Sequence, residues 1–452
     1  MIAIISLAIL GGILALGLIR PIWALAVIMS MFPIEQCFQG NASIFIERST
    51  LTNLMVAGVV AVAMVRLFLS GRLVVQRWLT PTLFLTTLLY AWAATSYIWT
   101  FSPEWLAEYI KEALPYVLLI VYGGSLLVSS IDDISELRTS LMVVGSLVSV
   151  LLIINPNFQF FAGRYMLRLN ATTWSNALAI GTLGAVLMLC AVLAPPSTGI
   201  RRLPILRIGA FIAGLGLAFL SGSRGQVMFA IFCGIIYYPL ARQMKSFRNF
   251  AALVAGVVLI GIGVVAVRSF FVGAENEARW SAESLLFGGE GRIENVTDLA
   301  NQYLRRPAFW AIGLGCLAFH DLPTTSGDPY SHVLVADLLF ELGLPGVILF
   351  SIIAILTIVN AVRLFRLVSH DPVRRANATL LIALVTFEFM LANKAGQLWG
   401  QTGFFLSCAL IARMSLLERD RAAAAIDAAY DADPEPASDA DPLPAGAVPA
   451  AS

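Results

Sequence analysis

Residues 208–241 read IGAFIAGLGLAFLSGSRGQVMFAIFCGIIYYPLA and contain a single charged residue, Arg224. The apolar stretch on each side of Ser221-Gly222-Ser223 and Arg224 is about one membrane crossing long, since a hydrocarbon core takes roughly 20 helical residues. A helix is expected because it satisfies its own backbone hydrogen bonds in lipid. The stretch therefore predicts two membrane helices joined by a tight turn that carries the arginine.

The same apolar pattern recurs along most of the chain. Hydrophobic residues make up 59% of its 452 residues and charged residues 13%, whereas a soluble domain has about 25% charged residues. The sequence therefore predicts an all-α integral membrane protein. Because the first two apolar segments are short enough to form one hairpin, we expect 12 or 13 transmembrane helices. The candidate segments are 2–18, 22–34, 50–69, 79–98, 113–129, 139–154, 173–193, 208–223, 225–241, 249–271, 343–362, 376–392 and 398–412.

Arginine and lysine predict how these helices are oriented, because basic residues favour the cytoplasmic side of a membrane. Four basic connections lie an even number of predicted spans apart, so one topology places all of them inside. That topology places residues 99–112, 155–172 and 273–328 outside. The basic connections are Arg66/Arg72/Arg77, Arg201/Arg202/Arg207, Arg242/Lys245/Arg248 and Arg363/Arg366/Arg374/Arg375.

The predicted organisation has four parts. They are an N-terminal transmembrane bundle (1–272), an outer loop with short helices (273–342), C-terminal transmembrane helices (343–415) and a disordered cytoplasmic tail (416–452). The tail is rich in Ala, Pro and Asp, a composition that cannot bury a core. The loop is longer than a simple connection needs, so we expect the chemistry of the protein there.

Two helices are predicted around this loop. Apolar residues recur at helical spacing over residues 293–304 and predict an amphipathic helix. Asp328-Pro329 predicts the start of the second helix, with His332 in its first turn. The run Leu344-Pro345-Gly346 predicts a kink where this second helix enters the membrane.

Arg224 is the first candidate functional residue. A lone charge at a membrane boundary indicates function by default, and a guanidinium can bind two phosphate oxygens at once. Ser223 belongs to the same turn and is a second candidate for binding. The alternative is an interfacial anchor that contacts lipid headgroups.

Five further arginines are candidates for binding an anionic substrate. Arg292 opens the loop helix, and its alternative is an exposed loop residue. Arg305 and Arg306 either contact substrate or complement the C-terminal end of that helix. Arg164 and Arg168 either contact an anionic lipid or form part of a basic and aromatic belt with Trp174.

His332 is the candidate general base, because a histidine has a pKa near neutrality. The alternative is a histidine packed at the membrane interface. His320 lies in the same loop, and His370 lies among cytoplasmic arginines. Because the histidines and carboxylates lack metal-ligand spacing, we expect no metal and no other cofactor. The five cysteines are scattered and are expected to be ordinary apolar residues.

Three blocks of the sequence resemble the bacterial O-antigen ligase and O-antigen polymerase superfamily, within residues 160–410. They resemble the family's Ser/Gly-Arg-Gly turn, its loop-opening Arg with a Pro-x-x-G-x-G stretch, and its His-Asn…Glu-x-Gly-x-x-Gly element. Arg164 with Trp174-Ser175-Asn176-Ala177 also resembles an earlier Arg…Asn-x-x-Ala block. The three blocks are Ser221-Gly222-Ser223-Arg224-Gly225, then Gly291-Arg292 with Pro307…Trp310-Ala311-Ile312-Gly313-Leu314-Gly315, and His332 with Glu341-Leu342-Gly343-Leu344-Pro345-Gly346.

The resemblance implies a GT-C-like glycosyltransferase, multi-pass in the bacterial inner membrane, with its loop in the periplasm. The donor would be a glycan on undecaprenyl pyrophosphate, with Arg224 and Arg292 stabilising the leaving pyrophosphate. His332 would take the proton of an acceptor hydroxyl, and Glu341 joins the candidate substrate-binding residues. The partners would be this donor, a saccharide acceptor (a growing chain or lipid A-core), membrane lipids and a chain-length regulator or flippase. A net charge of +1 indicates no nucleic acid.

Two functions within the superfamily and one outside it remain open. A polymerase would extend O-antigen or exopolysaccharide repeat units, and a ligase would attach the finished chain to lipid A-core or a protein. Val333 follows His332 where the family often has Asn, which favours the polymerase. A secondary transporter or lipid flippase is the alternative from a different class, but its charges would lie near the middle of the membrane.

Overall fold

The protein is described here by a computed structural model in which helices form almost every element. It describes residues 2–75, 77–161, 164–170, 173–195, 202–244, 246, 248, 250–251, 254–256, 290–322 and 330–432. The N-terminal half contains α1 (Ile2–Ile19), α2 (Pro21–Met29), α3 (Met31–Asn41), α4 (Ile44–Glu47), α5 (Thr50–Leu69), α6 (Pro81–Thr95), η1 (Ser96–Ile98), α7 (Pro103–Val117), the π-helical η2 (Leu118–Gly123), α8 (Gly124–Leu126), α9 (Asp133–Ile154), β1 (Phe158–Phe161), β2 (Arg164–Leu167), α10 (Ala177–Val192), α11 (Arg202–Leu220) and α12 (Arg224–Arg242). The C-terminal half contains α16 (Glu290–Leu304), η3 (Pro307–Phe309), η4 (Ala318–His320), α17 (Leu334–Val368), α18 (Pro372–Ala395), η5 (Leu398–Gly400) and α19 (Thr402–Ala432).

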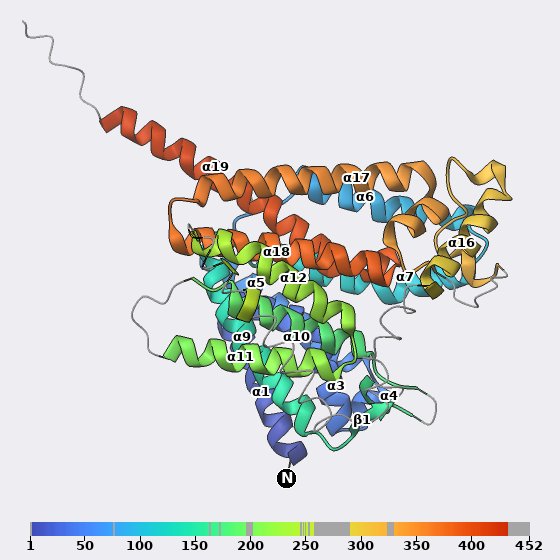
Figure 1. Cartoon of the computed structure of the whole chain (residues 1–452), viewed down its shortest axis with the longest axis horizontal. Helices are drawn as coiled ribbons and strands as arrows, with labels where there is room; N and C mark the ends of the chain where they lie inside the picture. Colours follow the sequence, from blue (N-terminus) through green and yellow to red (C-terminus); the bar gives the residue numbers. More distant parts are fainter. Residues whose placement is uncertain are drawn as a thin grey trace, which may run out of the picture.

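The long helices lie along the long axis of the molecule (Figure 1). α17 packs on α6 and α19, α18 packs on α12, and α10 packs on α11. α16 lies at one end of the bundle, and the last turns of α19 extend beyond the other end. α16 is therefore held at one end of the long helices, here called the outer end.

Five of the described helices are long and apolar enough to cross a membrane. Helices α2 and α3, which meet at 73°, form a sixth if they are one broken span, and three shorter apolar helices come from α1, α10 and α11. The all-α membrane fold is thus confirmed. The number of 12 or 13 spans stays a prediction, and most of segment 249–271 lies outside the described residues. The five helices are Thr50–Leu69, Asp133–Ile154, Arg224–Arg242, Leu334–Val368 and Pro372–Lys394.

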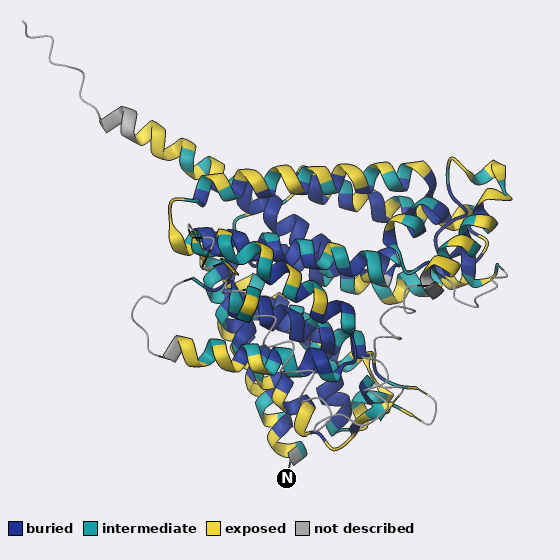
Figure 2. Ribbon diagram, viewed as in Figure 1, coloured by how far each residue is buried: buried dark blue, intermediate teal, exposed yellow. Residues whose placement is uncertain are grey.

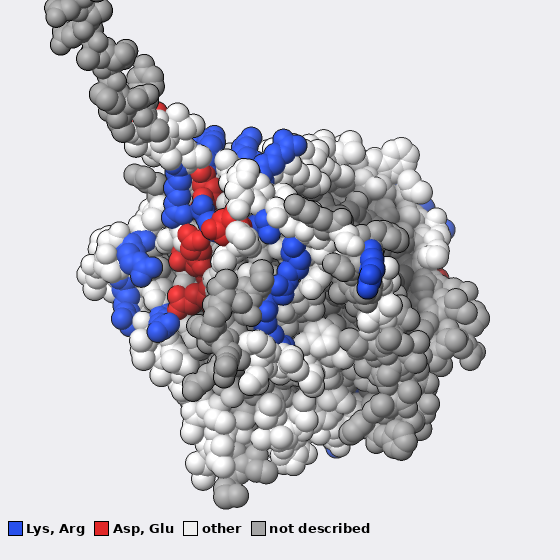
Figure 3. Space-filling model, turned by 60° about the vertical axis from the view of Figure 1, so that its left-hand side comes forward, with Lys and Arg blue, Asp and Glu red and all other residues white. Residues whose placement is uncertain are grey.

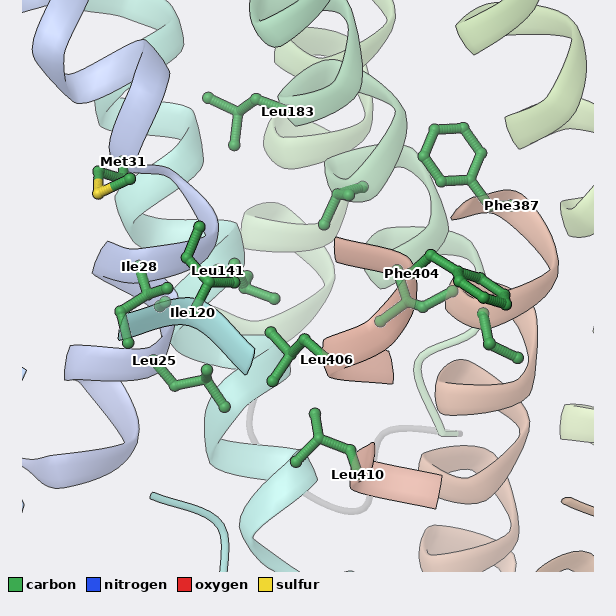
Figure 4. Packing of buried hydrophobic residues seen from close by; sticks show 14 of the residues in the cluster. Leu25, Ile28, Met31, Ile120, Leu141, Leu183, Phe387, Phe404, Leu406 and Leu410 are labelled. Atoms are coloured by element: carbon green, nitrogen blue, oxygen red, sulfur yellow. The ribbon is translucent and has the colours of Figure 1, made fainter. Parts of the chain in front are cut away.

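Apolar side chains occur both inside the bundle and on its surface. Figure 4 shows part of the interior, where Leu25 and Ile28 of α2 lie near Leu406 and Leu410 of α19. In α17, the inward positions are buried, but the outward ones include Ile355, which is 60% exposed, and Figure 2 shows this exposed face along the helix. An apolar exposed face on a long helix is expected where lipid covers it.

Several predicted boundaries differ from the structure. α17 begins at Leu334, so His332 precedes the helix and does not lie in its first turn; Asp328 and Pro329 are outside the described residues. α19 continues to Ala432, so the part of the predicted tail from residue 416 to 432 is helical. Residues 155–172, expected as a plain loop, contain the antiparallel pair of β1 and β2.

Other predictions of local structure are confirmed. The amphipathic loop helix is α16, and it ends at Leu304 before the two arginines. All five cysteines are buried and unpaired. The kink of the second helix is also present, and it falls at Gly343, whose φ of 66° and ψ of −158° are not helical.

Candidate functional site

The turn between α11 and α12 holds Arg224 at the outer end of the bundle. Gly222 has a φ of +64°, which closes the turn, and Arg224 is the first residue of α12. Gly181 of α10 leaves room for the turn, because a Cβ there would lie 2.7 Å from Ser221 Oγ. The Ser223 hydroxyl is buried and has no hydrogen-bond partner among the described residues. A half-buried arginine and an unused hydroxyl therefore lie at a helix N-terminus, where partial positive charge favours anions.

Arg164, at the start of β2, is near this turn. Burial lowers the pKa of its guanidinium, the positive charge of Arg224 lowers it further, and the Tyr330 hydroxyl raises it. Two half-buried guanidinium groups therefore repel each other across the turn. A bound anion would relieve that repulsion, and a pyrophosphate has enough oxygens for both groups.

Lys394, near the end of α18, adds a third positive charge that the sequence analysis did not select. Its side chain covers Gly225, where a Cβ would lie 2.5 Å from Lys394 Nζ. Nζ donates a hydrogen bond to Gln226 Oε1 at 3.0 Å. Lys394 is the sole basic residue between Arg375 and Arg413, a segment that also contains Glu388, so a search for isolated basic residues would have selected it.

His332 is held by its neighbours in an unusual backbone conformation with a φ of +61°. The Asp337 carboxylate accepts hydrogen bonds from the backbone N–H groups of Ser331 at 2.8 Å and Gln397 at 3.1 Å. Gly396 fits against this corner, because a Cβ there would lie 2.6 Å from Asp337 Oδ2 and 3.1 Å from His332 Cα. Asp337 thus ties the His332 segment to Gln397, which follows the end of α18 and is three residues beyond Lys394.

The structure brings Arg164, Arg224, Tyr330, His332 and Lys394 to the outer end of the bundle. The Tyr330 ring lies edge-on to the His332 ring, with 4.3 Å between centroids, and Tyr330 is also within electrostatic range of Arg164. We call these five residues the outer cationic site. It combines three positive charges with one histidine, which is the set needed to hold an anion beside a proton acceptor.

The other candidate arginines have different surroundings. Arg292 is the third residue of α16, and its side chain lies outside the described part of the chain. Arg305 is exposed. Arg306 donates hydrogen bonds to the backbone O of Gln302 at 2.6 Å and lies 5.4 Å from the Phe101 ring centre, so it caps and anchors α16. Arg168 lies 6.0 Å from the Trp174 ring centre, in the basic and aromatic arrangement named as its alternative.

Glu341 is buried and faces the loop before α17, within hydrogen-bond reach of the Cys316 thiol and the Leu317 backbone. The break at Gly343 leaves backbone carbonyls without helical partners. Leu314 N donates to Phe340 O at 2.8 Å, and Gly315 N donates to Glu341 O at 2.8 Å. The described contacts of Glu341 therefore join the loop to the helix break, and none of them involves the outer cationic site.

Glycine is required where the loop meets this break. Gly313 has a φ of +81°, and a Cβ there would lie 2.2 Å from Glu341 O. A Cβ on Gly343 would lie 2.4 Å from Ala311 O. The backbone of the loop and the backbone of the helix break therefore approach too closely for any side chain. This explains why Gly313 and Gly343 are glycines in their two sequence blocks.

Comparison with known proteins gives one match and one negative result. Residues 209–351 match the family model described as O-Antigen ligase, and no curated protein matches the chain in sequence. The matched segment includes the Arg224 turn, α16, His332 and the helix break, while Arg164 and Lys394 lie outside it. This match over residues 209–351 supports the resemblance of the chain to the O-antigen ligase and polymerase superfamily.

Proposed function

We propose that this protein is a membrane glycosyltransferase that moves a glycan from undecaprenyl pyrophosphate to a saccharide acceptor on the periplasmic side. Its product would be a longer O-antigen or exopolysaccharide chain. The observation that carries the proposal is the pair of half-buried arginines, Arg164 and Arg224, which lie within electrostatic range of each other at the outer end. The O-antigen ligase family match supports glycan transfer as the reaction class.

The reaction needs one bond to form and one to break. The acceptor hydroxyl oxygen forms a bond to the anomeric carbon, and the bond from that carbon to the pyrophosphate oxygen breaks. Its electron pair leaves with the pyrophosphate, and the hydroxyl proton moves to His332. Attack opposite the leaving group inverts the anomeric centre. The step requires neither nucleotide nor metal.

In this proposal Arg164, Arg224 and Lys394 stabilise the negative charge that develops on the pyrophosphate. Charged donors that are already in place near a low-dielectric wall stabilise such charge without reorganising. We include Arg292 as a further donor, because it begins α16 next to the same end of the bundle. The Ser223 hydroxyl is free to donate to a phosphate oxygen.

The ligase is the second candidate, and the family match supports it as well as the polymerase. It uses the same donor chemistry and differs in its acceptor, lipid A-core or a protein. A transporter is less well supported, since its binding site would lie near the middle of broken helices. Arg224 and Lys394 instead lie at the outer ends of α12 and α18.

Replacement of His332 tests the reaction. Purified protein is given an undecaprenyl-pyrophosphate-linked glycan and an acceptor, with excess chelator and no nucleotide, and the transferred glycan is measured. We expect His332→Ala to reduce turnover by about 10²–10⁴-fold, the usual worth of a positioned acid–base group. Donor binding should persist because the three cations remain. The control is His370→Ala, an exposed residue next to the start of α18.

Two results would contradict the proposal at different levels. If folded wild-type protein transfers no glycan from its matched donor, the protein is not this enzyme. If His332→Ala retains full turnover, the enzyme stands but another group accepts the proton. Loss of the acidic limb from the pH–rate profile of His332→Ala would support His332 as the base.

A further inference from the structure

A polar cavity of about 280 Å³ lies beside the β-hairpin, next to α3 and α4. Its polar lining comes from Gln39 of α3, Asn157 and Gln159 at β1, and Arg168 directly after β2. The elements that form it lie toward the same end of the molecule as α16 (Figure 1). The cavity is separate from the five residues of the outer cationic site.

Three of the four polar lining residues carry amide side chains. An amide offers two N–H donors and a carbonyl acceptor, so it can pair with a hydroxyl whichever way the hydroxyl points. Gln39 Nε2 donates to Glu35 Oε1 at 3.1 Å, and Asn157 Nδ2 donates to the backbone O of Gly40 at 2.7 Å. These bonds fix the two amides in place and use one donor of each, which leaves their remaining polar atoms for a ligand.

An aromatic pair that does not itself line the cavity lies beside Arg168, which does. The Trp174 and Phe161 rings are stacked, with centroids 4.3 Å apart and an interplanar angle of 9°. The Arg168 guanidinium lies 6.0 Å from the centre of the Trp174 ring. Fixed amides beside flat aromatic rings match the hydroxyl edge and the apolar face of a pyranose ring.

The hairpin also connects the cavity to the outer cationic site. Arg164 begins β2 and Arg168 follows its end, so the two arginines are separated by about 13 Å at roughly 3.3 Å per strand residue. A glycan bonded to a pyrophosphate at Arg164 can therefore extend along the strand toward Arg168. We propose that the cavity is a saccharide subsite, which binds sugar units of the lipid-linked donor.

This inference rests on the proposed function. The lining of the cavity also differs from that of a site for a lipid headgroup. A headgroup phosphate is bound through positive charges. Arg168 is the one cation among the residues that line the cavity, whereas three lining residues are amides. The lining thus favours a neutral ligand with many hydroxyl groups.

The test compares two ligands that differ in the glycan alone. Binding of bare undecaprenyl pyrophosphate and of the undecaprenyl-pyrophosphate-linked repeat unit from the source bacterium is measured on the full chain in nanodiscs. We expect Gln159→Ala and Arg168→Gln each to weaken binding of the glycan-bearing lipid by about 3–10-fold, since a lost hydrogen bond costs roughly 0.5–1.5 kcal/mol. Binding of the bare lipid should not change. Asn301→Ala is the matched control, because Asn301 is an exposed amide on α16.

Other binding results would overturn the saccharide subsite or the proposed function. The saccharide subsite would be overturned if the two variants bind both ligands equally more weakly than wild type. It would also be overturned if they bind both ligands as tightly as wild type. An effect of Arg168→Gln that appears in phosphatidylglycerol nanodiscs and disappears in phosphatidylcholine nanodiscs would also overturn it, since a headgroup would then be the ligand. Arg164→Gln should weaken both ligands. If wild-type protein binds neither ligand, the proposed function itself fails.

Discussion

Arg224 and Lys394 come from distant parts of the sequence, yet both side chains lie at the N-terminal end of α12. Arg224 is the first residue of α12, and Lys394 covers Gly225 in the same turn. Each comes from a segment rich in apolar residues, where a charge at the membrane boundary indicates function. At the residue scale, the site is therefore a concentration of positive charge that an anionic group would stabilise.

The shape of the Arg224 side chain should matter as well as its charge. Lysine is a point charge and cannot bind two phosphate oxygens in a fork, so we expect Arg224→Lys to lower transfer by about 10–100-fold without loss of expression. Glycan transfer by the purified variant is the measurement. Arg66→Lys is the control, since exposed Arg66 donates a single hydrogen bond to Leu18 O at 2.9 Å. Full activity of Arg224→Lys would reduce Arg224 to a membrane anchor.

His320 should make the stability of the protein depend on pH. Its ring stacks on Trp105 with 4.9 Å between centroids. Burial lowers the pKa of His320, and Asp321 opposes this by raising it. On acidification the unfolded chain then takes up the proton first, near pH 6.5. The stabilisation is complete above that pH and is lost as the pH falls through the folded pKa.

Thermal unfolding in detergent measures this effect. We expect the melting temperature to fall between about pH 7 and pH 5, and His320→Gln to remove part of that fall. His370→Gln should leave the pH dependence unchanged, because His370 is exposed. An unchanged fall in His320→Gln would show that other groups cause it.

Candidate residues could be selected from the sequence where an isolated charge lies in an apolar segment. Arg224 was selected in this way, and Lys394 could have been selected in the same way. Arg306 and Arg168 have no such feature, since their hydrogen bonds and aromatic contacts depend on parts of the chain that pack against them. The role of Asp337 in holding the His332 corner also requires the fold, because its two partners are 6 and 60 residues away.

At the scale of elements, the break of α17 organises the outer end. Carbonyl groups that the break exposes accept hydrogen bonds from Leu314 and Gly315, and Leu342 O accepts one from the Trp92 indole at 3.0 Å. The loop before α17 is thus bound to its helix by backbone hydrogen bonds. α16, which begins with the block containing Arg292, is followed directly by this bound loop.

Gly343 should therefore tolerate no side chain. Its φ and ψ lie in a region open almost solely to glycine, which costs other residues about 1–3 kcal/mol. A Cβ would also meet three backbone atoms within 2.6 Å. We expect Gly343→Ala to lower the melting temperature and the yield of folded protein. Gly209→Ala in α11, where no atom lies within 4 Å of the added Cβ, should have neither effect. Equal stability of the two variants would mean that the break is not required.

Helices were predictable from apolar length, but their ends and the hairpin were not. The first turn of α17 was placed too early because Asp328-Pro329 has the pattern of a helix start. His332 instead takes a positive φ and lies against Gly396, outside the helix. The hairpin has short strands of four residues each, too short for a clear alternating pattern.

On the scale of the whole molecule, charge separates the two ends of the bundle. Figure 3 shows acidic side chains grouped among basic side chains near the start of the α19 extension. Arg374 bridges Asp132 at 3.5 Å and also pairs with buried Glu418, and Arg77 pairs with Asp420 at 2.9 Å. The outer cationic site differs from this end, because it combines three cations with a histidine. The basic connections lead us to expect that the end with the arginines and carboxylates faces the cytoplasm.

Cysteine labelling in intact cells tests the orientation. All five native cysteines are buried, so an impermeant maleimide should react with introduced cysteines alone. We expect Asn301→Cys on α16 to be labelled from outside, and Ala425→Cys on the α19 extension to be labelled after lysis. Both positions are exposed, and the wild-type chain is the control. Labelling of Ala425→Cys but not of Asn301→Cys in intact cells would reverse the topology and place the site on the wrong side for its donor.

The helix break has a consequence for how related chains are identified. Gly313 and Gly343 are present because two stretches of backbone touch at the break, and Gly315 is present because it lies against Thr100. These requirements are the same for every sugar and every acceptor. A genome search built on these glycines would therefore collect proteins that share the break, whatever glycan they handle. A search that also requires Arg164, Arg224 and Lys394 would sort that collection by its capacity to hold a leaving pyrophosphate.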